Sequence, residues 1–371
     1  MEQKRLGDIA TYINGYAFKP EDRGTEGLPI IRIQDLTGNS YDLGFYDGEY
    51  PEKIEINNGD ILISWSASLG VYVWNKGKAL LNQHIFKVVF DKLDINKQYF
   101  VFAIRYNLKE MEKQTHGATM KHITKKDFDK ILIPFPDLKI QSEIAETLDT
   151  LQSIITHRRT QLEKLDLLVK ARFVEMFGEV HENCEIGYYI KSLIAGKSLA
   201  GEEECDNKVL KTGAVSFDYF DITQVKNLPV NYEPKEAHLV NTGDIIISRM
   251  NTAELTGAAA YVWNAPKKVY IPDRLWKAVL TENSNPIFVW QMLIQPSTKE
   301  QIQKKCSGTS GSMKNISKAG LLKIKVKKVP LNIQTQFADF VRQVDKSKVA
   351  VQKALDEAQL LFDSLMQEYF G

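Results

Sequence analysis

The chain contains two short segments that resemble catalytic motifs, and each lacks a residue that the chemistry requires. Gly196-Lys197-Ser198 matches the end of a phosphate-binding P-loop, but Lys191 stands where the loop needs its first glycine. Pro134-Phe135-Pro136 lacks the asparagine that precedes the proline pair in the base-binding loop of an adenine methyltransferase, and no glycine-rich cofactor turn accompanies it. We therefore predict that this chain carries out neither nucleotide hydrolysis nor methyl transfer by itself.

A third segment places Asp137 and Lys139 after a proline, as in some nucleases, but Pro330-Leu331-Asn332 at the matching place later in the chain has no acid. A carboxylate just before a helical pattern is better explained as a helix cap. The six histidines show no metal-ligand spacing, and we expect His84 and His122 to pack or to form hydrogen bonds. The sequence thus predicts no catalytic residue and no metal site.

Two loops rich in hydroxyl groups and glycine are suited to binding an anion. Thr115-His116-Gly117-Ala118-Thr119 comes shortly before Lys121, and the run from Ser307 through Thr309 and Ser310 to Ser312 comes just before Lys314. Hydroxyl groups, free backbone N–H groups and a lysine are typical contacts to a phosphate. The alternative is a flexible turn that binds nothing.

Side chains that could hydrogen-bond to base edges follow a strand that occurs twice, Gly59-Asp60-Ile61-Leu62-Ile63-Ser64 and Gly243-Asp244-Ile245-Ile246-Ile247-Ser248. Arg249 could pair with guanine and Asn251 with adenine, each pairing contributing roughly 1–3 kcal/mol of discrimination. The candidates around the two strand ends are Ser64, Trp65, Ser66 and Ser68 in the first copy, and Arg249, Asn251 and Thr252 in the second. Gln34 with Asp35, and Lys211 with Thr212, follow another pair of strands and are second-rank candidates.

These strands belong to a repeat with a period near 190 residues. Tyr72-Val73-Trp74-Asn75 recurs as Tyr261-Val262-Trp263-Asn264, and Met120-Lys121-His122-Ile123 recurs as Met313-Lys314-Asn315-Ile316. A duplicated chain is two copies of one structural unit. The residues after the shared strand differ between the copies, as expected if each copy recognises a different ligand sequence.

Each copy begins with short β-rich runs separated by Gly, Asn and Asp, which predict strands at 30–33, 61–63, 71–74 and 85–89 in the first copy. Helical patterns at 100–112 and 287–293 interrupt them, so each head is predicted to be α+β. We expect the first head at 1–138, a long helix at 139–178, the second head at 179–332 and a second long helix at 333–371.

The two long helices carry apolar residues in alternating steps of four and three, which is a coiled-coil pattern. The predicted pairing positions are Ile144, Leu148, Leu151, Ile155, Leu162, Leu165 and Val169, then Phe337, Val341, Val344, Val351, Leu355, Phe362 and Leu365, with Arg158, Arg172 and Lys348 as polar members. A helix of this length spans roughly 58 Å, more than a small head can cover. We predict that the stripes pair with each other antiparallel about a pseudo-two-fold axis; the alternative is that each helix packs on its own head.

Composition places few further limits on function. The formal net charge is +1, so global charge does not indicate a nucleic-acid partner. Locally, the stretch 299–328 has nine lysines and one acid, and its strand Lys323–Lys327 could contact a phosphate backbone or protect a sheet edge. Three cysteines, Cys184, Cys205 and Cys306, fit a reducing cytoplasm, and no apolar run is long enough to cross a membrane.

This ordered set of motifs, occurring twice, resembles the specificity (S) subunit of type I restriction-modification systems. The resemblance spans essentially the whole chain and includes the Ile140-Gln141 and Ile333-Gln334 helix starts. It implies two target recognition domains that each read one half of a split duplex DNA site, with a separation that we expect to be on the order of 10 to 15 base pairs.

The resemblance also implies partners: two methyltransferase subunits that bind S-adenosylmethionine and modify adenine, and restriction subunits that use ATP and Mg²⁺. This chain would bind no cofactor itself. Outward charges on the first long helix, Arg158, Arg159, Lys164, Lys170 and Arg172, could dock a methyltransferase subunit or simply face solvent. Two other functions stay open: a protein scaffold whose heads bind proteins, and an enzyme in its own right.

Overall fold

The computed structural model describes residues 2–39, 42–66, 68–114, 124–308 and 313–371. Within these ranges no helix is long and apolar enough to span a membrane. The chain forms two compact units. The first unit is Met1–Thr160 with Gln352–Gly371, and the second is Gln161–Val351. Each unit therefore contains one head and parts of both long helices, which the predicted boundaries had kept as separate segments.

The first unit contains a four-stranded antiparallel sheet in the order β2-β9-β6-β7, formed by Thr11–Asn14, Ile85–Val89, Ile61–Ser64 and Gly70–Val73. A second small sheet, β4-β3-β8-β5, consists of Phe45–Tyr46, Leu28–Ile31, Ala79–Leu81 and Glu55–Ile56, and its β3–β8 pair is parallel. β1 (Gln3–Arg5) pairs with β10 (Leu132–Pro134). The helices are α1 (Leu6–Ile9), α2 (Ile33–Thr37), α3 (Lys97–Gln114), α4 (Lys125–Phe128) and 3-10 turns at Pro20–Asp22 and Glu52–Ile54.

The second unit repeats this topology with a four-stranded sheet β12-β19-β15-β17, formed by Ile190–Ala195, Leu275–Leu280, Ile245–Ser248 and Ala259–Tyr261. β14 (Val225–Asn227), β13 (Lys208–Leu210) and β18 (Val269–Tyr270) form a smaller sheet, with a parallel β13–β18 pair. β11 (Asn183–Glu185) pairs with β21 (Lys325–Lys327), and β16 (Met250–Asn251) with β20 (Lys314–Asn315). The helices are α6 (Pro286–Leu293), α7 (Pro296–Lys304), α8 (Lys318–Leu322) and 3-10 turns at Ile186–Tyr188, Thr212–Val215 and Glu236–His238.

The two α+β heads predicted from the repeat are thus confirmed, including their strands at 61–63 and 85–89. The strand predicted at 30–33 is wrong at its end, since β3 stops at Ile31 and Ile33 begins α2. The physical reason is a capping box: the Asp35 carboxylate accepts a hydrogen bond from the Arg32 backbone N–H at 2.8 Å and starts a helical turn.

The repeated Gly-Asp pair is structural. Gly59 and Gly243 have φ values of 90° and 93°, which favour glycine. Next to them, Asp60 pairs with Lys87 at 3.1 Å and Asp244 with Lys277 at 3.5 Å. Burial raises the pKa of Asp244, and Lys277 opposes that shift. This partly buried ion pair joins the shared strand to its neighbour in both heads, so retention of the motif follows from folding and needs no ligand.

Two further glycines occupy matching positions, because a side chain there would strike the neighbouring strand. A Cβ at Gly15 would overlap the carbonyl oxygen of Asn82, and one at Gly196 would overlap that of Ile271. We expect Gly196→Ala to lower the free energy of unfolding by about 1–3 kcal/mol, measured by urea titration, since backbone must move to admit the methyl group. Gly187→Ala is the control, because its Cβ would meet Leu322 O at an ordinary 3.5 Å; equal losses in both variants would contradict this explanation.

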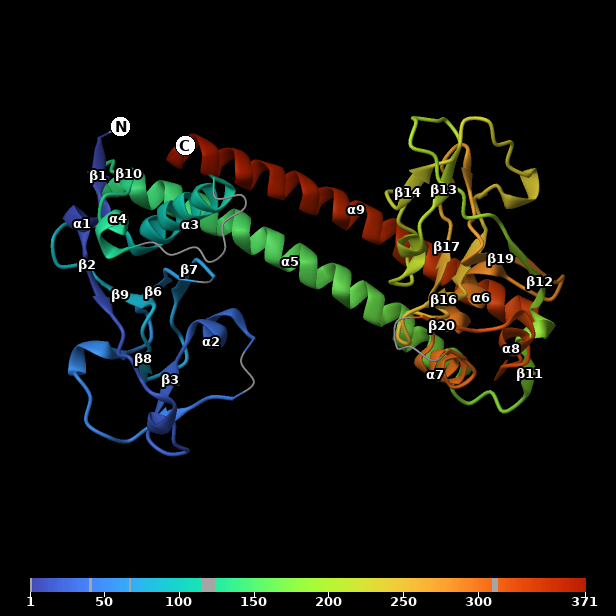
Figure 1. The fold of residues 1–371 in the computed structure, drawn as a ribbon, viewed down its shortest axis with the longest axis horizontal. Coiled ribbons are helices and arrows are strands. Elements are labelled where there is room, and N and C mark those ends of the chain that lie inside the picture. Colours follow the sequence, from blue (N-terminus) through green and yellow to red (C-terminus); the bar gives the residue numbers. More distant parts are fainter. Residues whose placement is uncertain (1, 40–41, 67, 115–123, 309–312) are drawn as a thin grey trace. The chain divides into compact units, whose positions relative to one another are not determined.

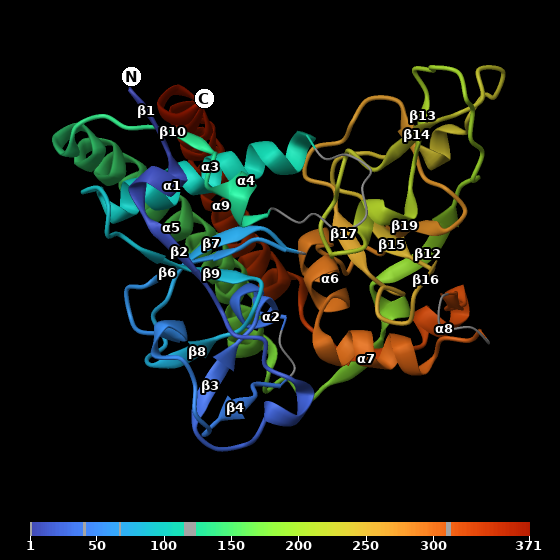
Figure 2. The same ribbon diagram turned by 60° about the vertical axis from the view of Figure 1, so that its left-hand side comes forward.

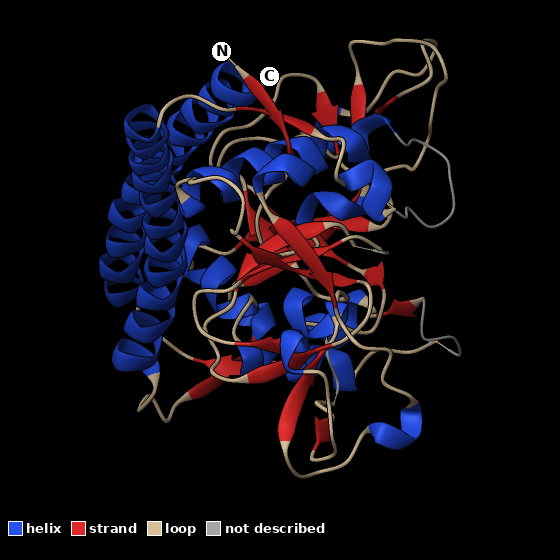
Figure 3. Cartoon of the chain, turned by 90° about the vertical axis from the view of Figure 1, so that its left-hand side faces the viewer, coloured by secondary structure: helices blue, strands red, loops and turns tan. Residues whose placement is uncertain are grey.

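The long helices are α5 (Leu138–Phe177) and α9 (Leu331–Phe370). None of the predicted pairing positions is exposed, from Ile144 to Val169 and from Phe337 to Leu365. In the first unit the start of α5 packs with the end of α9, as the shared core of Ile144, Leu148 and Phe370 shows. In the second unit Val169 shares a core with Val341 and Val344, and Lys348 pairs with Asp166 at 2.6 Å. Antiparallel pairing is thus confirmed within each unit. Figure 3 distinguishes the helices, in blue, from the strands, in red.

The helix ends also pack on the heads, so the two alternatives for these helices are both partly true. Phe173 and Phe177 of α5 meet Phe337 of α9 at ring-centroid distances of 5.5 and 5.4 Å. Phe177 also lies 5.2 Å from Phe288 of α6, inside the head. Each helix end is therefore a joint between the helix pair and a head (Figures 1 and 2).

The glutamine in each Ile-Gln helix start fixes that joint. Gln141 and Gln334 are fully buried. Gln141 accepts a hydrogen bond from the Asn96 backbone N–H at 2.9 Å and donates to Pro136 O at 2.8 Å. Gln334 accepts from the Asn285 backbone N–H at 2.9 Å and donates to Val329 O at 2.8 Å. Asp137 caps α5, accepting from the Ile140 N–H at 2.9 Å, as the sequence predicts.

Candidate nucleic-acid interface

In the second unit the structure brings two separately predicted groups of residues together on one small ribbon. β16 and β20 pair so that Asn251 lies opposite Lys314 and Met250 lies opposite Asn315. The backbone of Ser307 bridges to Asn315, and the Ile316 N–H donates to Arg249 O at 3.1 Å. The strand exit and the hydroxyl-rich loop are therefore neighbours, although about 60 residues separate them in the chain.

Arg249 is half-buried with its guanidinium over the Trp276 ring, 5.8 Å from the ring centroid. Its Nε atom is buried and has no hydrogen-bond partner within the described ranges. A cation stacked on an aromatic face keeps its charge and its donors in a fixed direction. The arrangement suits a pre-positioned arginine that completes its hydrogen bonds on a ligand.

Asn251 already uses its amide group. Its Nδ2 donates to Ser216 Oγ at 3.4 Å, and its Oδ1 accepts from the Thr252 N–H at 2.9 Å. Pairing of Asn251 with adenine would have to exchange both hydrogen bonds, so Arg249 is the stronger candidate of the two. Thr252 is exposed beside it.

The loop before β20 is described only at its edges. Lys314 donates through Nζ to Gly308 O at 2.8 Å, and Gly308 has a φ of 130°. Ser307 is exposed, whereas Thr309 and Ser310 lie outside the described residues. Burial raises the pKa of the Cys306 thiol against the opposing effect of Lys314, so this cysteine is not an activated nucleophile.

The matching strand exit in the first unit presents an aromatic residue in place of the arginine. The Trp65 indole is stacked on Phe86, with ring centroids 5.6 Å apart, and donates to Asn14 Oδ1 at 3.3 Å. Ser64 and Ser66 are buried, and the Ser64 hydroxyl donates to Ser68 O at 2.6 Å. In this structure Ser64 and Ser66 hold the turn and offer little surface to a ligand, while Ser68 is exposed.

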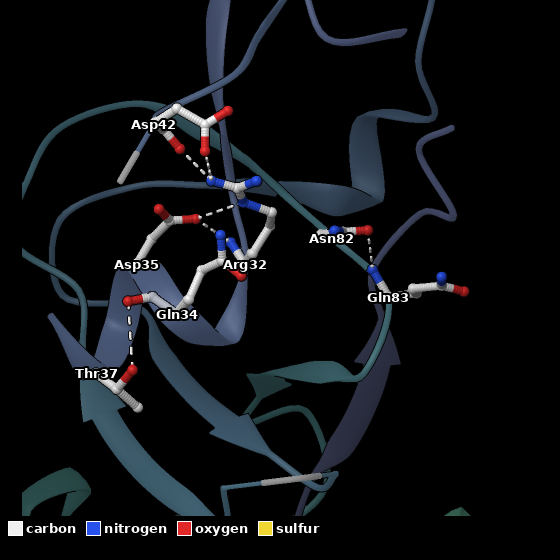
Figure 4. Close-up of polar contacts among 7 residues, drawn as sticks. All are labelled: Arg32, Gln34, Asp35, Thr37, Asp42, Asn82 and Gln83. Atoms are coloured by element: carbon white, nitrogen blue, oxygen red, sulfur yellow. Dashed lines mark hydrogen bonds and ion pairs between the residues drawn. The ribbon is translucent and has the colours of Figure 1, made fainter. Parts of the chain in front are cut away.

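The other predicted loop of the first unit, with Thr115, His116, Thr119 and Lys121, lies outside the described residues. Gln34 is exposed at the start of α2, and Thr37 Oγ1 donates to its backbone oxygen at 3.3 Å. With its amide oxygen turned inward, the Gln34 side chain accepts from the Arg32 guanidinium at 3.1–3.2 Å. Gln34 therefore extends a polar cluster that sequence reasoning missed (Figure 4).

Arg32 is the centre of that cluster, and only 7% of its surface is exposed. Its Nε donates to Asp35 Oδ2 at 3.1 Å, and its NH2 group donates to the backbone oxygen of Asp42 (Figure 4). Register places Lys211 at the corresponding point of the second unit, because Arg32 follows β3 as Lys211 follows β13. Lys211 is exposed, so one position is a buried arginine in one head and an exposed lysine in the other.

The lysine-rich strand is less available than the sequence suggests. Lys325 pairs with Glu185 at 3.3 Å and Lys328 pairs with Glu182 at 2.6 Å, while Lys327 donates to Val180 O. These contacts tie β21 to the neighbourhood of β11, which favours the edge-protecting role over contact with a phosphate backbone. No group of His, Cys, Asp and Glu in the described ranges could hold a metal ion.

Comparison with known proteins decides the family. The model of the type I restriction modification DNA specificity domain matches residues 1–165 and again residues 192–358. The chain belongs to the type I DNA specificity family. The two matches coincide with the two copies of the repeat, as the resemblance predicts.

Several specificity subunits are similar to this family member over different lengths. The EcoBI specificity subunit of Escherichia coli is 30% identical over 168 residues, which cover 44% of this chain and 35% of that protein. The MjaVIII specificity subunit of Methanocaldococcus jannaschii is 24% identical, with coverage of 95% and 89%, respectively. The EcoKI specificity subunit of Escherichia coli K12 is 22% identical, with coverage of 98% and 86%.

Solved structures of other proteins share the fold of this chain. The S subunit of a type I restriction-modification system from M. genitalium aligns with a TM-score of 0.62 at 16% identity and covers 100% of this chain and 96% of its own. A chain from a study of complex assembly and conformational transition of the type I R-M system aligns with a TM-score of 0.57 at 14% identity. Two similar α+β heads and two long helices are thus the family's architecture.

Proposed function

We propose that this chain is the non-catalytic DNA specificity subunit of a type I restriction-modification system, reading a bipartite duplex site with one half per head. The observation that carries the proposal is one strand exit, built twice on the same Gly-Asp frame, that presents Trp65 in one head and Arg249 in the other. A shared frame with different exposed chemistry is what two readers of different half-sites require. Family membership supports it, as does a relative named as a specificity subunit that matches over 95% of this chain and 89% of its own length.

The test is a map of methylated adenines in cellular DNA with and without this chain. We expect a split motif with a constant gap to carry methylation only when the chain is present, because the chain supplies the sequence preference for the enzyme. Unchanged methylation after its removal would contradict the proposal. The motif would also give both half-sites and the gap between them.

The scaffold alternative makes a different prediction in a salt titration of duplex binding by the purified chain. Phosphate contacts release counterions, so affinity for DNA should fall steeply as salt rises. A protein-binding scaffold would show no duplex binding, or binding without that steep dependence. Methyl transfer by the chain alone with S-adenosylmethionine would revive the enzyme alternative.

The proposed partners are two methyltransferase subunits, which would carry S-adenosylmethionine, and restriction subunits, which would carry ATP and Mg²⁺. Support for a docking surface comes from α5 in the second unit, where Leu167 is 60% exposed and Leu168 47% exposed. A cavity of about 620 Å³ in the same unit is lined by Asp166 and Lys170 of α5 and by aromatic residues of the head, including Trp263, and not by the two leucines. Large apolar side chains that are exposed side by side are typical of a protein-binding surface.

We expect the double substitution Leu167→Asp and Leu168→Asp to abolish co-purification of the methyltransferase subunit, because two buried carboxylates would each have to be desolvated at the interface. The measurement is a pull-down followed by analytical ultracentrifugation. Val349→Asp, at a position of α9 that is 64% exposed in the same unit, is the control. Normal assembly of the double variant would place the docking surface elsewhere.

A further inference from the structure

We propose that Arg274 in the second unit reads a base edge beside Arg249, and that His84 is its counterpart in the first unit. The inference rests on the proposed function, because it adds a second specificity-determining position to each reading head. Neither residue comes directly after the repeated strand in the sequence. Each is placed beside the end of that strand by pairing within the central sheet.

The register of the central sheet places these residues. In the second unit Ile247 lies opposite Trp276 and Ser248 opposite Leu275, and the next pair is joined by the Arg249 N–H donating to Arg274 O at 3.1 Å. In the first unit Ser64 lies opposite Ile85, and the Trp65 N–H donates to His84 O at 3.2 Å. Arg274 and His84 are thus the cross-strand neighbours of the two residues at which the heads diverge.

The Arg274 side chain is exposed and forms no ion pair or hydrogen bond with any residue in the described ranges. Its surroundings are otherwise ordered: Asp273 accepts a hydrogen bond from Ser198 Oγ, and Leu275 is buried. Other arginines of this unit are engaged, as Arg342 is with Asp339 at 2.6 Å. A free guanidinium on a fixed turn can offer two parallel donors to a guanine edge.

His84 is half-buried, whereas Arg274 is exposed, but its conformation and its contacts also set it apart. Its φ is 73°, a left-handed conformation that the turn imposes on a residue other than glycine. The imidazole lies 4.9 Å from the Trp65 ring, and its Nδ1 atom is buried without a hydrogen-bond partner in the described part of the chain. A left-handed residue at a strand exit, with a polar atom that the fold leaves unsatisfied, indicates a position kept for binding.

The two heads share the ion pair next to the strand exit and differ at the exit itself. Lys87 and Lys277, each three residues further along these strands, make equivalent ion pairs in the two heads. At the strand exit the pair is Trp65 with His84 in the first head, but Arg249 with Arg274 in the second. The heads therefore differ in the pair of residues at the strand exit, and each head carries its own pair on the same kind of sheet.

The experiment uses the assembled complex with its methyltransferase partner and maps adenine methylation for Arg274→Ala and Arg274→Lys. We expect both variants to lose discrimination by about ten-fold or more at one base pair of one half-site, because lysine keeps the charge but not the paired donors. That half-site should be the one altered by Arg249→Ala, and the other should be unchanged. Lys267→Ala removes an exposed cation from the same unit and should leave the motif unaltered.

An unchanged motif in both Arg274 variants would overturn the inference. So would a uniform loss of methylation across all sequences that Arg274→Lys restores, since this is the behaviour of a phosphate contact. For the first head, His84→Asn tolerates the left-handed conformation and should alter only the other half-site. If the motif does not depend on the chain at all, the proposed function fails, which is distinct from failure at Arg274 alone.

Discussion

Replacing Arg249 by alanine is expected to relax specificity at one base pair of one half-site and to leave the other half-site unchanged. Arg249 lies over Trp276 and its guanidinium forms no hydrogen bond within the described ranges; the Nε atom is buried, so a base would pair with the terminal NH groups. Loss of a bidentate base contact should reduce discrimination by about 1–3 kcal/mol at that position. Sequencing of methylated DNA would show the motif becoming degenerate there.

Two control variants separate base reading from other roles of Arg249. Arg249→Lys keeps the charge over the indole but not the planar pair of donors, so it should resemble the alanine variant in specificity. Thr252→Ala changes an exposed neighbour without touching Trp276 and should have a smaller effect. Weakening of methylation by the same factor at every sequence would instead identify Arg249 as a phosphate contact.

Replacing Phe337 by alanine is expected to lower the free energy of unfolding of the second unit by about 3–5 kcal/mol. Its ring is fully buried and meets the rings of Phe173 and Phe177, which in turn contact Phe288 of the head. Loss of the ring would leave a cavity at the place where both long helices pack against the head. Urea titration followed by circular dichroism measures the loss.

The control for Phe337 is Val349→Ala on the same helix, where 64% of the side chain is exposed and little apolar contact is lost. Its free energy of unfolding should change by less than about 0.5 kcal/mol. A small effect of Phe337→Ala would mean that the joint can close around the cavity. A specificity assay of the folded fraction should still give the normal motif, because Phe337 lies in the core and not at the strand exit.

Sequence periodicity was sufficient for the helices because burial of a helix face depends on spacing alone. The predicted pairing positions between Ile144 and Val169 and between Phe337 and Leu365 are all buried or half-buried, including the polar members Arg158 and Lys348. The packing of the helix ends on the heads was less predictable. Ala145, Phe173 and Ala338 lie outside the seam and are buried by residues that are distant in the chain.

Local sequence misled where a side chain redirected the backbone. Ile33 continues a β-rich run, but the Asp35 carboxylate satisfies the Arg32 N–H and turns the chain into α2. The lysine-rich strand is a second case, because its acidic partners are Glu185 in β11 and Glu182 just before it, about 140 residues earlier. Neither contact can be predicted from the composition of a short stretch of sequence.

The sequence by itself determined that there are two copies of one α+β head, that two long helices carry a pairing stripe, and that the heads diverge after the Gly-Asp strand. These properties depend on sequence patterns that are either local or present in both copies of the repeat. Only the tertiary structure decided which residues are cross-strand neighbours: Asn251 with Lys314, Arg249 with Arg274, and Trp65 with His84. Cross-strand neighbours are set by register between segments separated by a loop of arbitrary length, and that register is fixed by burial of the whole sheet.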